Sequence, residues 1–231
     1  MDEMDFRARP TPERPLLGLT VLVVEDSHAA SDAVRLLCLR SGARIRRADC
    51  VASADRHLNV YRPSVAIVDL GLPDGSGLDL IAAMHARRPR VPIVLGTSGA
   101  DRQEAERQVR AAGADGFLAK PLDSLAAFQA TILALVPESL RPKGPRVVEA
   151  SEVAPDPIAY REDLAHAMGL LAQDDPPVIY LRRFLLGVAR TAHDRALEDR
   201  AAGMAQDMDA SARRALHGFL SQRVQGLPLA I

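Results

Sequence analysis

The sequence has few of the residues that mark several classes of protein. Its 231 residues include two cysteines and no tryptophan, and only 3% are aromatic. Two cysteines cannot build a disulfide framework, and Cys38 and Cys50 are not part of a metal-ligand pattern, so we expect both to be buried as small hydrophobic side chains. No apolar run approaches the ~18 residues of a membrane span. The first 15 residues also lack the apolar core of a signal peptide. We therefore expect a cytoplasmic protein with no membrane partner.

A basic segment is also missing. Nucleic-acid-binding domains usually carry a surplus of Lys and Arg in one block. The formal net charge here is −1, and residues 156–231 carry nine basic and ten acidic side chains. We therefore expect no affinity for nucleic acid.

The chain divides into four compositional segments. Residues 1–18 hold three prolines among charges and predict a flexible leader, residues 138–157 predict a Pro-rich linker, and residues 158–231 predict helices only. Between them, residues 19–137 alternate short apolar runs with helical periodicity. This alternation predicts an α/β fold with a doubly wound, five-stranded parallel sheet, followed by a small all-α module. The expected strands are 21–24, 43–48, 65–69, 92–95 and 116–119, and the expected helices are 33–40, 53–60, 77–87, 102–112 and 124–136.

Chemically active side chains follow four of these strands. Glu25 and Asp26 come after the first, Asp69 ends the third, Thr97 ends the fourth and Lys120 ends the fifth. Because the carboxyl ends of parallel strands meet at one edge of a sheet, we expect these groups to lie together. Clustered carboxylates repel one another unless a hard cation neutralises them, and oxygen ligands suit Mg²⁺. A divalent cation beside a lysine is suited to holding a phosphoryl group.

Residues 19–137 resemble the receiver domain of two-component response regulators, which has a flavodoxin-like fold. The resemblance rests on four motifs in the family's order, namely VLVVEDS at 21–27, AIVDLGLPDGSG at 66–77, PIVLGTSG at 92–99 and GADGFLAKP at 113–121. It implies that a sensor histidine kinase or a histidine phosphotransfer protein donates a phosphoryl group to this domain.

The resemblance also implies a role for individual residues. Asp69 matches the phosphoacceptor, and Thr97 and Lys120 match the hydroxyl and the ammonium that bind phosphoryl oxygens. The implied ligands of Mg²⁺ are Glu25, acting largely through water, together with Asp26, Asp69 and the backbone carbonyl of Gly71.

Two further positions match, and one departs. Phe117 matches an aromatic residue that changes rotamer on phosphorylation, and Pro121 falls where a cis peptide bond is common. Gly96 stands where an apolar residue is usual, which predicts a loosened end of the fourth strand. Glycines at the second position after Asp69 and after Thr97 offer no side chain to shield a phosphoryl group, so its lifetime is left open.

The C-terminal segment predicts three helices, with Leu164 on the first, Leu181 and Leu185 on the second and Leu216 on the third. The apolar stripe of the second helix is wide for so small a bundle, so we expect it to form a homodimer or to bind a protein partner. His28 and His193 are interpreted as ordinary surface histidines rather than as a catalytic base and a phosphorylated histidine.

The sequence therefore predicts a phosphorelay response regulator, not an enzyme with external substrates, whose helical module acts through protein contacts. We expect the face formed by the helices at 102–112 and 124–136, around Phe117 and Phe128, to bias the association of that module when Asp69 is phosphorylated. One alternative is a transcriptional or RNA-binding response regulator, and another is a Mg²⁺-dependent phosphatase or phosphotransferase. The cognate kinase, the downstream target and the effect of phosphorylation on a dimer are not readable from the sequence.

Overall fold

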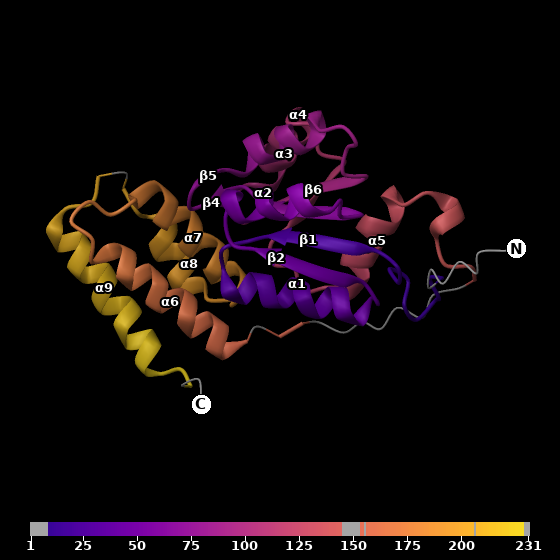
Figure 1. Ribbon diagram of the computed structural model, residues 1–231. Helices are drawn as coiled ribbons and strands as arrows, with labels where there is room; N and C mark the ends of the chain where they lie inside the picture. The colour runs from indigo at the N-terminus through magenta and orange to yellow at the C-terminus, as the bar shows by residue number, and fades with distance from the viewer. Residues whose placement is uncertain (1–8, 145–152, 155, 206, 229–231) are drawn as a thin grey trace, which may run out of the picture.

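The chain forms an α/β domain followed by a helical module that packs against it (Figure 1). This computed structural model describes residues 9–144, 153–154, 156–205 and 207–228. The first eight residues of the predicted leader and residues 145–152 and 155 of the predicted linker lie outside the described residues.

A parallel sheet forms the centre of the α/β domain. Its strands lie in the order β2-β1-β3-β6-β7, and all neighbouring pairs are parallel. The central strands are short runs of Val, Ile, Leu and Ala that are buried on both faces, which is typical of parallel sheets. The bounds are β1 (Thr20–Val24), β2 (Arg44–Ala48), β3 (Val65–Asp69), β6 (Ile93–Ser98) and β7 (Gly116–Ala119).

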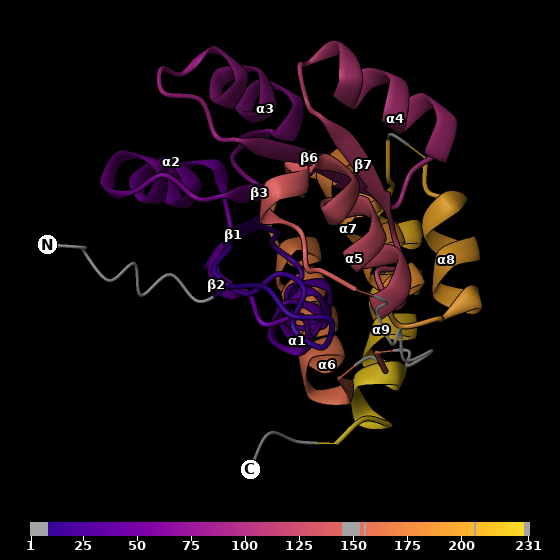
Figure 2. The same ribbon diagram turned by 90° about the vertical axis from the view of Figure 1, so that its right-hand side faces the viewer.

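Helices cover both faces of this sheet (Figure 2). The core on one face contains Leu37 of α1 and Phe128 of α5, and the core on the other contains Ala54 of α2, Ile81 of α3 and Val109 of α4. The doubly wound fold predicted from the sequence is thus confirmed. The bounds are α1 (His28–Arg40), α2 (Val51–Val60), α3 (Gly77–Ala86), α4 (Arg102–Ala111) and α5 (Leu125–Leu135).

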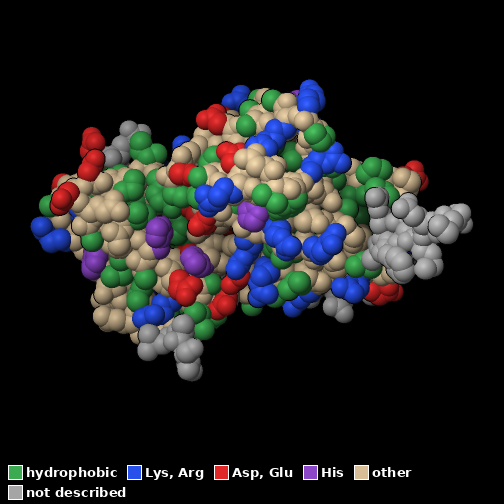
Figure 3. All heavy atoms as spheres, viewed as in Figure 1, with side chains coloured by type: hydrophobic (Ala, Val, Ile, Leu, Met, Phe, Trp, Pro, Cys, Tyr) green, Lys and Arg blue, Asp and Glu red, His purple; other side chains and the backbone are tan. Residues whose placement is uncertain are grey.

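The strand at one edge of the sheet is basic. Arg44, Arg46 and Arg47 of β2 are exposed, and blue side chains gather over this part of the surface in Figure 3. Charged side chains along an edge strand oppose pairing with another chain. Arg47 also pairs with Asp32 of α1 at 2.6 Å, so we attribute this basic edge to protection of the sheet.

A short hairpin of β4 (Gly71–Leu72) and β5 (Gly75–Ser76) was not predicted. It leads directly into α3, where a Cβ on Gly77 would lie 2.0 Å from the backbone oxygen of Asp69. Only glycine permits this close approach. The hairpin therefore holds the chain after Asp69 tightly against the end of β3.

The packed part of the chain begins earlier than the predicted boundary at Leu19. Leu16 is fully buried in the core, and its backbone N–H donates to Ser41 O at 2.9 Å. Cys38 is buried as expected, whereas Cys50 is half-buried because it is the N-cap residue of α2.

Within the described residues, the helical module contains one helix more than the sequence predicted. The additional helix is α8, which has eight residues and only one large apolar side chain, Leu197. Aspartates begin three of the helices, each accepting a hydrogen bond from a backbone N–H of the first turn. The bounds are η1 (Glu138–Leu140), α6 (Pro157–Leu171), α7 (Val178–Thr191), α8 (Arg195–Ala202) and α9 (Ala210–Gln225).

The apolar stripe of α7 is not a free surface. Leu181, Leu185 and Val188 are fully buried in a core that they share with residues of α6, α8 and α9. The expectation of surplus apolar surface on this stripe was therefore wrong, because the neighbouring helices already cover it.

The module lies at the end of the α/β domain where the parallel strands terminate. Helix α6 packs along α1, and α7 contacts both α1 and β4 (Figure 1). None of the described helices is long and apolar enough to cross a membrane.

Candidate phosphoacceptor site

Three carboxylates converge beyond the ends of β1 and β3. Glu25 and Asp26 follow β1, Asp69 is the last residue of β3, and one oxygen of each lies within 4.8 Å of the others. Glu25 is 4% exposed and Asp69 is 7% exposed. The sheet therefore brings together the acidic residues that the sequence predicted for this edge.

Lys120 connects two of these carboxylates. Its Nζ lies 2.7 Å from Glu25 Oε2 and 3.0 Å from Asp69 Oδ1. Burial would lower the pKa of Lys120, but the charges of Asp69 and Glu25 outweigh it and raise that pKa above its ordinary value. Lys120 therefore stays an ammonium group.

One ammonium is not enough for three carboxylates. Burial, together with the charge of Asp69, raises the pKa of Glu25 to about 8 and that of Asp26 to about 7. Such shifts mean that the ionised carboxylates lack compensating charge. A hard divalent cation with oxygen ligands supplies that charge, so the donor set fits Mg²⁺.

Thr97 stands beside the carboxylates with an unused hydroxyl group. It pairs in register with Asp69 across β3 and β6 and is 1% exposed. Its Oγ1 has no hydrogen-bond partner among the described residues. A buried hydroxyl without a partner is costly, which indicates a ligand whose oxygen would accept its proton.

The chain after Asp69 contributes a backbone donor. Gly71 N–H donates to Asp69 Oδ2 at 3.0 Å, and this bond fixes the orientation of the carboxylate. Lys120 holds its other oxygen, so the side chain is held from both sides.

The remaining predicted positions lie at the edge of the site. Phe117 on β7 is half-buried against the core beneath α4, and the Lys120–Pro121 peptide bond is cis, as the resemblance implied. Gly96 has a packing reason, because a Cβ there would lie 2.5 Å from Val109 Cγ2 of α4. Strand β6 continues to Ser98, so Gly96 does not end it.

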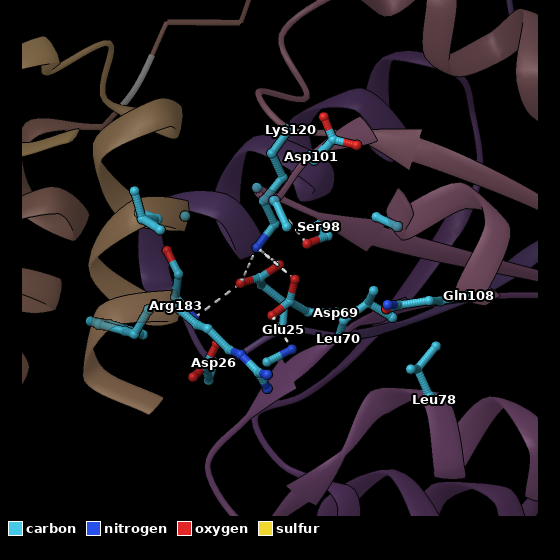
Figure 4. A pocket seen from close by; sticks show the side chains of 18 of the residues that line it. Glu25, Asp26, Asp69, Leu70, Leu78, Ser98, Asp101, Gln108, Lys120 and Arg183 are labelled. Carbon is cyan, nitrogen blue, oxygen red and sulfur yellow. Dashed lines mark hydrogen bonds and ion pairs between the residues drawn. The ribbon is translucent and has the colours of Figure 1, made fainter. Parts of the chain in front are cut away.

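Sequence reasoning missed the contribution of α7. Its residues Arg183, Phe184 and Gly187 line a cavity of about 380 Å³ together with Asp69 and Lys120. Figure 4 shows Arg183 reaching from α7 into this pocket beside Asp26. No signal in the sequence indicated this, because α7 has the pattern of an ordinary amphipathic helix and lies far from the acidic residues in the chain.

One residue of α7 contacts a carboxylate directly. Tyr180 Oη donates to Asp26 Oδ2 at 2.6 Å. Burial, with the charge of Asp26 next in importance, raises the pKa of Tyr180 above its ordinary value, so the phenol keeps its proton. The oxygen of Asp26 that accepts this proton is thus occupied by the module.

Helix α6 contributes a second buried contact. Asp163 is fully buried and accepts hydrogen bonds from Ser27 Oγ at 2.7 Å, His28 N at 2.7 Å and Ala29 N at 3.1 Å. These groups form the start of α1, where backbone N–H groups lack helical partners and a carboxylate is favourable. These hydrogen bonds to Asp163 therefore hold α6 against the loop that carries Asp26.

The histidines that the sequence drew attention to lie outside the cavity. The ring of His28 faces Glu162 at 3.3 Å and is 63% exposed. His193 is in the turn between α7 and α8, with a φ of 53°, and is not a helical residue.

Comparison with known proteins decides what the α/β domain is. Residues 21–132 match the family described as response regulator receiver domain. The chain carries a response regulator receiver domain. Receiver domains of this family are parts of two-component systems. The α/β domain is called the receiver domain below.

Relatives of known role match over the receiver domain. The transcriptional regulatory protein PhoP of Escherichia coli O157:H7 is 36% identical over 103 residues, which are 45% of this chain and 46% of that protein. The virulence transcriptional regulatory protein PhoP of Shigella flexneri matches to the same extent. The chain thus spans about half the length of these relatives.

Solved structures also match over this half of the chain. The chemotaxis response regulator CheY4 of Vibrio cholerae is 22% identical, with a TM-score of 0.47, over 51% of this chain and 98% of that one. A two-component response regulator from Clostridium difficile is 17% identical, with a TM-score of 0.46, over 51% and 94%.

Proposed function

We propose that the protein is a response regulator that accepts a phosphoryl group on Asp69 in a Mg²⁺-dependent reaction. The observation that carries this proposal is the joint arrangement around Asp69. Its carboxylate is held by Lys120 and by the Gly71 N–H, while the buried Thr97 hydroxyl has no partner among the described residues. These groups match the needs of an acyl phosphate, which has negative oxygens that require donors.

In the proposed reaction, an oxygen of Asp69 attacks the phosphorus atom of the donor. The bond between phosphorus and the donor's nitrogen or oxygen breaks, and the leaving group takes the electron pair. Lys120 neutralises charge beside the acceptor throughout, and Thr97 turns its hydroxyl proton toward a phosphoryl oxygen. Phosphoryl transfer depends mainly on such positioning and charge stabilisation, so no general base is required.

The residues that would hold Mg²⁺ are Glu25, Asp26, Asp69 and the backbone carbonyl of Gly71. When bound, the ion would neutralise the charge that builds up on the transferred group. Glu25 forms an ion pair with Lys120, which supports a role through water. Asp26 forms no ion pair with an ammonium group in the described part of the chain, which supports direct contact with the ion.

The phosphoryl donor we propose is a sensor histidine kinase or a histidine phosphotransfer protein, since this is what a receiver domain implies. We further propose that the helical module delivers the output through protein contacts. The relatives named as transcriptional regulators favour the alternative that the output is transcriptional. However, the family match ends at residue 132, before the module begins, so it gives no support for any particular output of the module.

Incubation with acetyl phosphate and Mg²⁺, followed by intact-mass spectrometry, tests the proposal. We expect one labile phosphoryl adduct on the wild-type chain and none on Asp69→Asn. The matched control is Asp101→Asn, which lines the same cavity and caps α4, and which we expect to be labelled. Full labelling of Asp69→Asn would refute the assignment. Continuous turnover of a small phosphate ester would instead favour the phosphatase alternative.

A further inference from the structure

We propose that helix α7 competes with Mg²⁺ for the phosphoacceptor site, so that loading of the site and docking of the helical module oppose each other. This inference rests on the proposed function, because it concerns the same acidic cluster. It adds that the module is a built-in competitor, and that its release from the receiver domain is the first event after loading.

The direct evidence is the contact between Tyr180 and Asp26. A phenol that donates at 2.6 Å and a metal ion cannot use the same lone pair of Asp26 Oδ2. Tyr180 is part of a helix that also packs against α1 and β4, so its hydrogen bond to Asp26 contributes to the docking of α7. Metal binding at Asp26 through that oxygen therefore removes one of the contacts that hold the module.

Helix α7 also packs closely on the receiver loops, so that it forms one wall of the cavity of about 380 Å³ beside Asp69. A Cβ on Gly99 would lie 3.2 Å from Gly187 Cα, and a Cβ on Gly71 would lie 3.5 Å from Arg183 Cβ. The helix thus rests on both loops that flank Asp69. A phosphohistidine carried on another protein has to approach Asp69 from outside the receiver domain, and α7 covers the cavity in front of it.

The charged groups around the carboxylates in the docked state also favour competition between α7 and Mg²⁺. The three carboxylates face Lys120, and Arg183 from α7 is the cation that the module adds to the cavity lining. The phenol proton of Tyr180 gives Asp26 one polar partner where Mg²⁺ would give two positive charges. The module and the metal therefore offer alternative partners to the same carboxylate.

Coupling between two binding events is reciprocal. If docking of α7 weakens Mg²⁺ binding by a given factor, Mg²⁺ weakens docking by the same factor. The module is held by a second contact, in which Asp163 accepts hydrogen bonds from the start of α1. Loss of either this contact or the bond from Tyr180 to Asp26 should make release of the module easier.

Calorimetric titration of the full chain with Mg²⁺ alone tests the proposal. Tyr180→Phe removes the phenol proton and leaves the ring in place. Loss of the hydrogen bond leaves that oxygen of Asp26 open to the metal, so we expect Mg²⁺ to bind about tenfold more tightly to this variant. The matched control is Tyr160→Phe, because Tyr160 Oη donates to Asp194 Oδ2 at 2.6 Å inside the module, away from the acidic cluster. We expect that control to bind Mg²⁺ as the wild type does.

Amide hydrogen exchange gives a readout that does not depend on the metal-binding constant. The N–H groups of His28 and Ala29 donate to Asp163 in the docked state. We expect Mg²⁺ with acetyl phosphate to accelerate their exchange in the wild type. We expect Asp163→Asn to exchange rapidly at the same amides without either addition, while remaining folded.

The outcomes separate this inference from the proposed function. Unchanged or weaker Mg²⁺ binding by Tyr180→Phe would overturn the competition and would make Tyr180 a supporting part of the loaded site. Unchanged exchange at His28 and Ala29 on loading would overturn the release of the module. Absence of an adduct on wild-type Asp69 would refute the proposed function, whereas tighter Mg²⁺ binding by Tyr180→Phe would still support the competition.

Discussion

The buried hydroxyl of Thr97 should lower the stability of the unphosphorylated protein, because it is held ready to bind a phosphoryl oxygen. Thr97 Oγ1 is buried and has no hydrogen-bond partner among the described residues. A buried polar group left unsatisfied costs about 1–3 kcal/mol. Thr97→Val replaces the hydroxyl with a methyl group of similar size, in a strand position where Val is favoured. We therefore expect the variant without phosphoryl donor to be more stable than the wild type by about 1–2 kcal/mol.

Phosphorylation should reverse that order. In the phosphorylated wild type, the hydroxyl donates to a charged oxygen, and such a bond is worth about 1.5–3 kcal/mol. We therefore expect acetyl phosphate with Mg²⁺ to raise the free energy of unfolding of both proteins. The increase should be about 1.5–3 kcal/mol larger for the wild type than for Thr97→Val.

Urea denaturation, with and without acetyl phosphate and Mg²⁺, measures both effects. Thr191→Val is the matched control, because Thr191 Oγ1 of α7 is also buried without a partner among the described residues but does not line the cavity. We expect this control to gain stability without losing the response to phosphorylation. A Thr97→Val variant that is less stable than the wild type, or that responds fully, would refute the reasoning.

Three other measurements test single features of the structure. Gly96→Ala should lower the free energy of unfolding by about 1–3 kcal/mol through overpacking against Val109, and adding Val109→Ala should restore part of that loss in a double-mutant cycle. In Mg²⁺ titrations, Asp26→Ala should lose more affinity than Glu25→Ala, because Lys120 already holds Glu25; equal losses would contradict this. Burial lowers the pKa of His166 in the folded state below its ordinary value of 6.5. The folded state then binds fewer protons than the unfolded state, so stability should fall as pH drops below about 6.5 and level off below the pKa of the folded state; His166→Gln should flatten that decline.

The sheet and its acidic edge were predictable because their signals are local. Runs such as VLVV and VAIVD combine β-branched residues with the length of a buried strand. Once the strands are parallel, topology alone brings Asp26, Asp69 and Lys120 to the same edge. No side-chain contact had to be known in advance.

The role of the helical module was not predictable for the opposite reason. The contact between Tyr180 and Asp26 joins residues 154 positions apart, and it depends on how one packed unit lies on another. In the sequence, the apolar face of α7 looked like an unfilled interface, whereas the structure shows it buried in the module. The contact with Asp26 comes from Tyr180, outside the buried apolar stripe of α7, and helical periodicity assigns such positions to solvent.

This contact also changes the expected route from Asp69 to the output. The sequence pointed to the face of α4 and α5 around Phe117 and Phe128, and this stays a prediction; Phe128 is 1% exposed and Phe117 is half-buried. The module instead touches Asp26, whose oxygen lies within 4.8 Å of an oxygen of Asp69. On the competition proposed above, a change of charge at Asp69 would reach the module through one carboxylate and one phenol. If this short route is correct, replacing Phe117 with Leu should leave the Mg²⁺-dependent exchange at the start of α1 unchanged, while Tyr180→Phe should abolish its dependence on Mg²⁺.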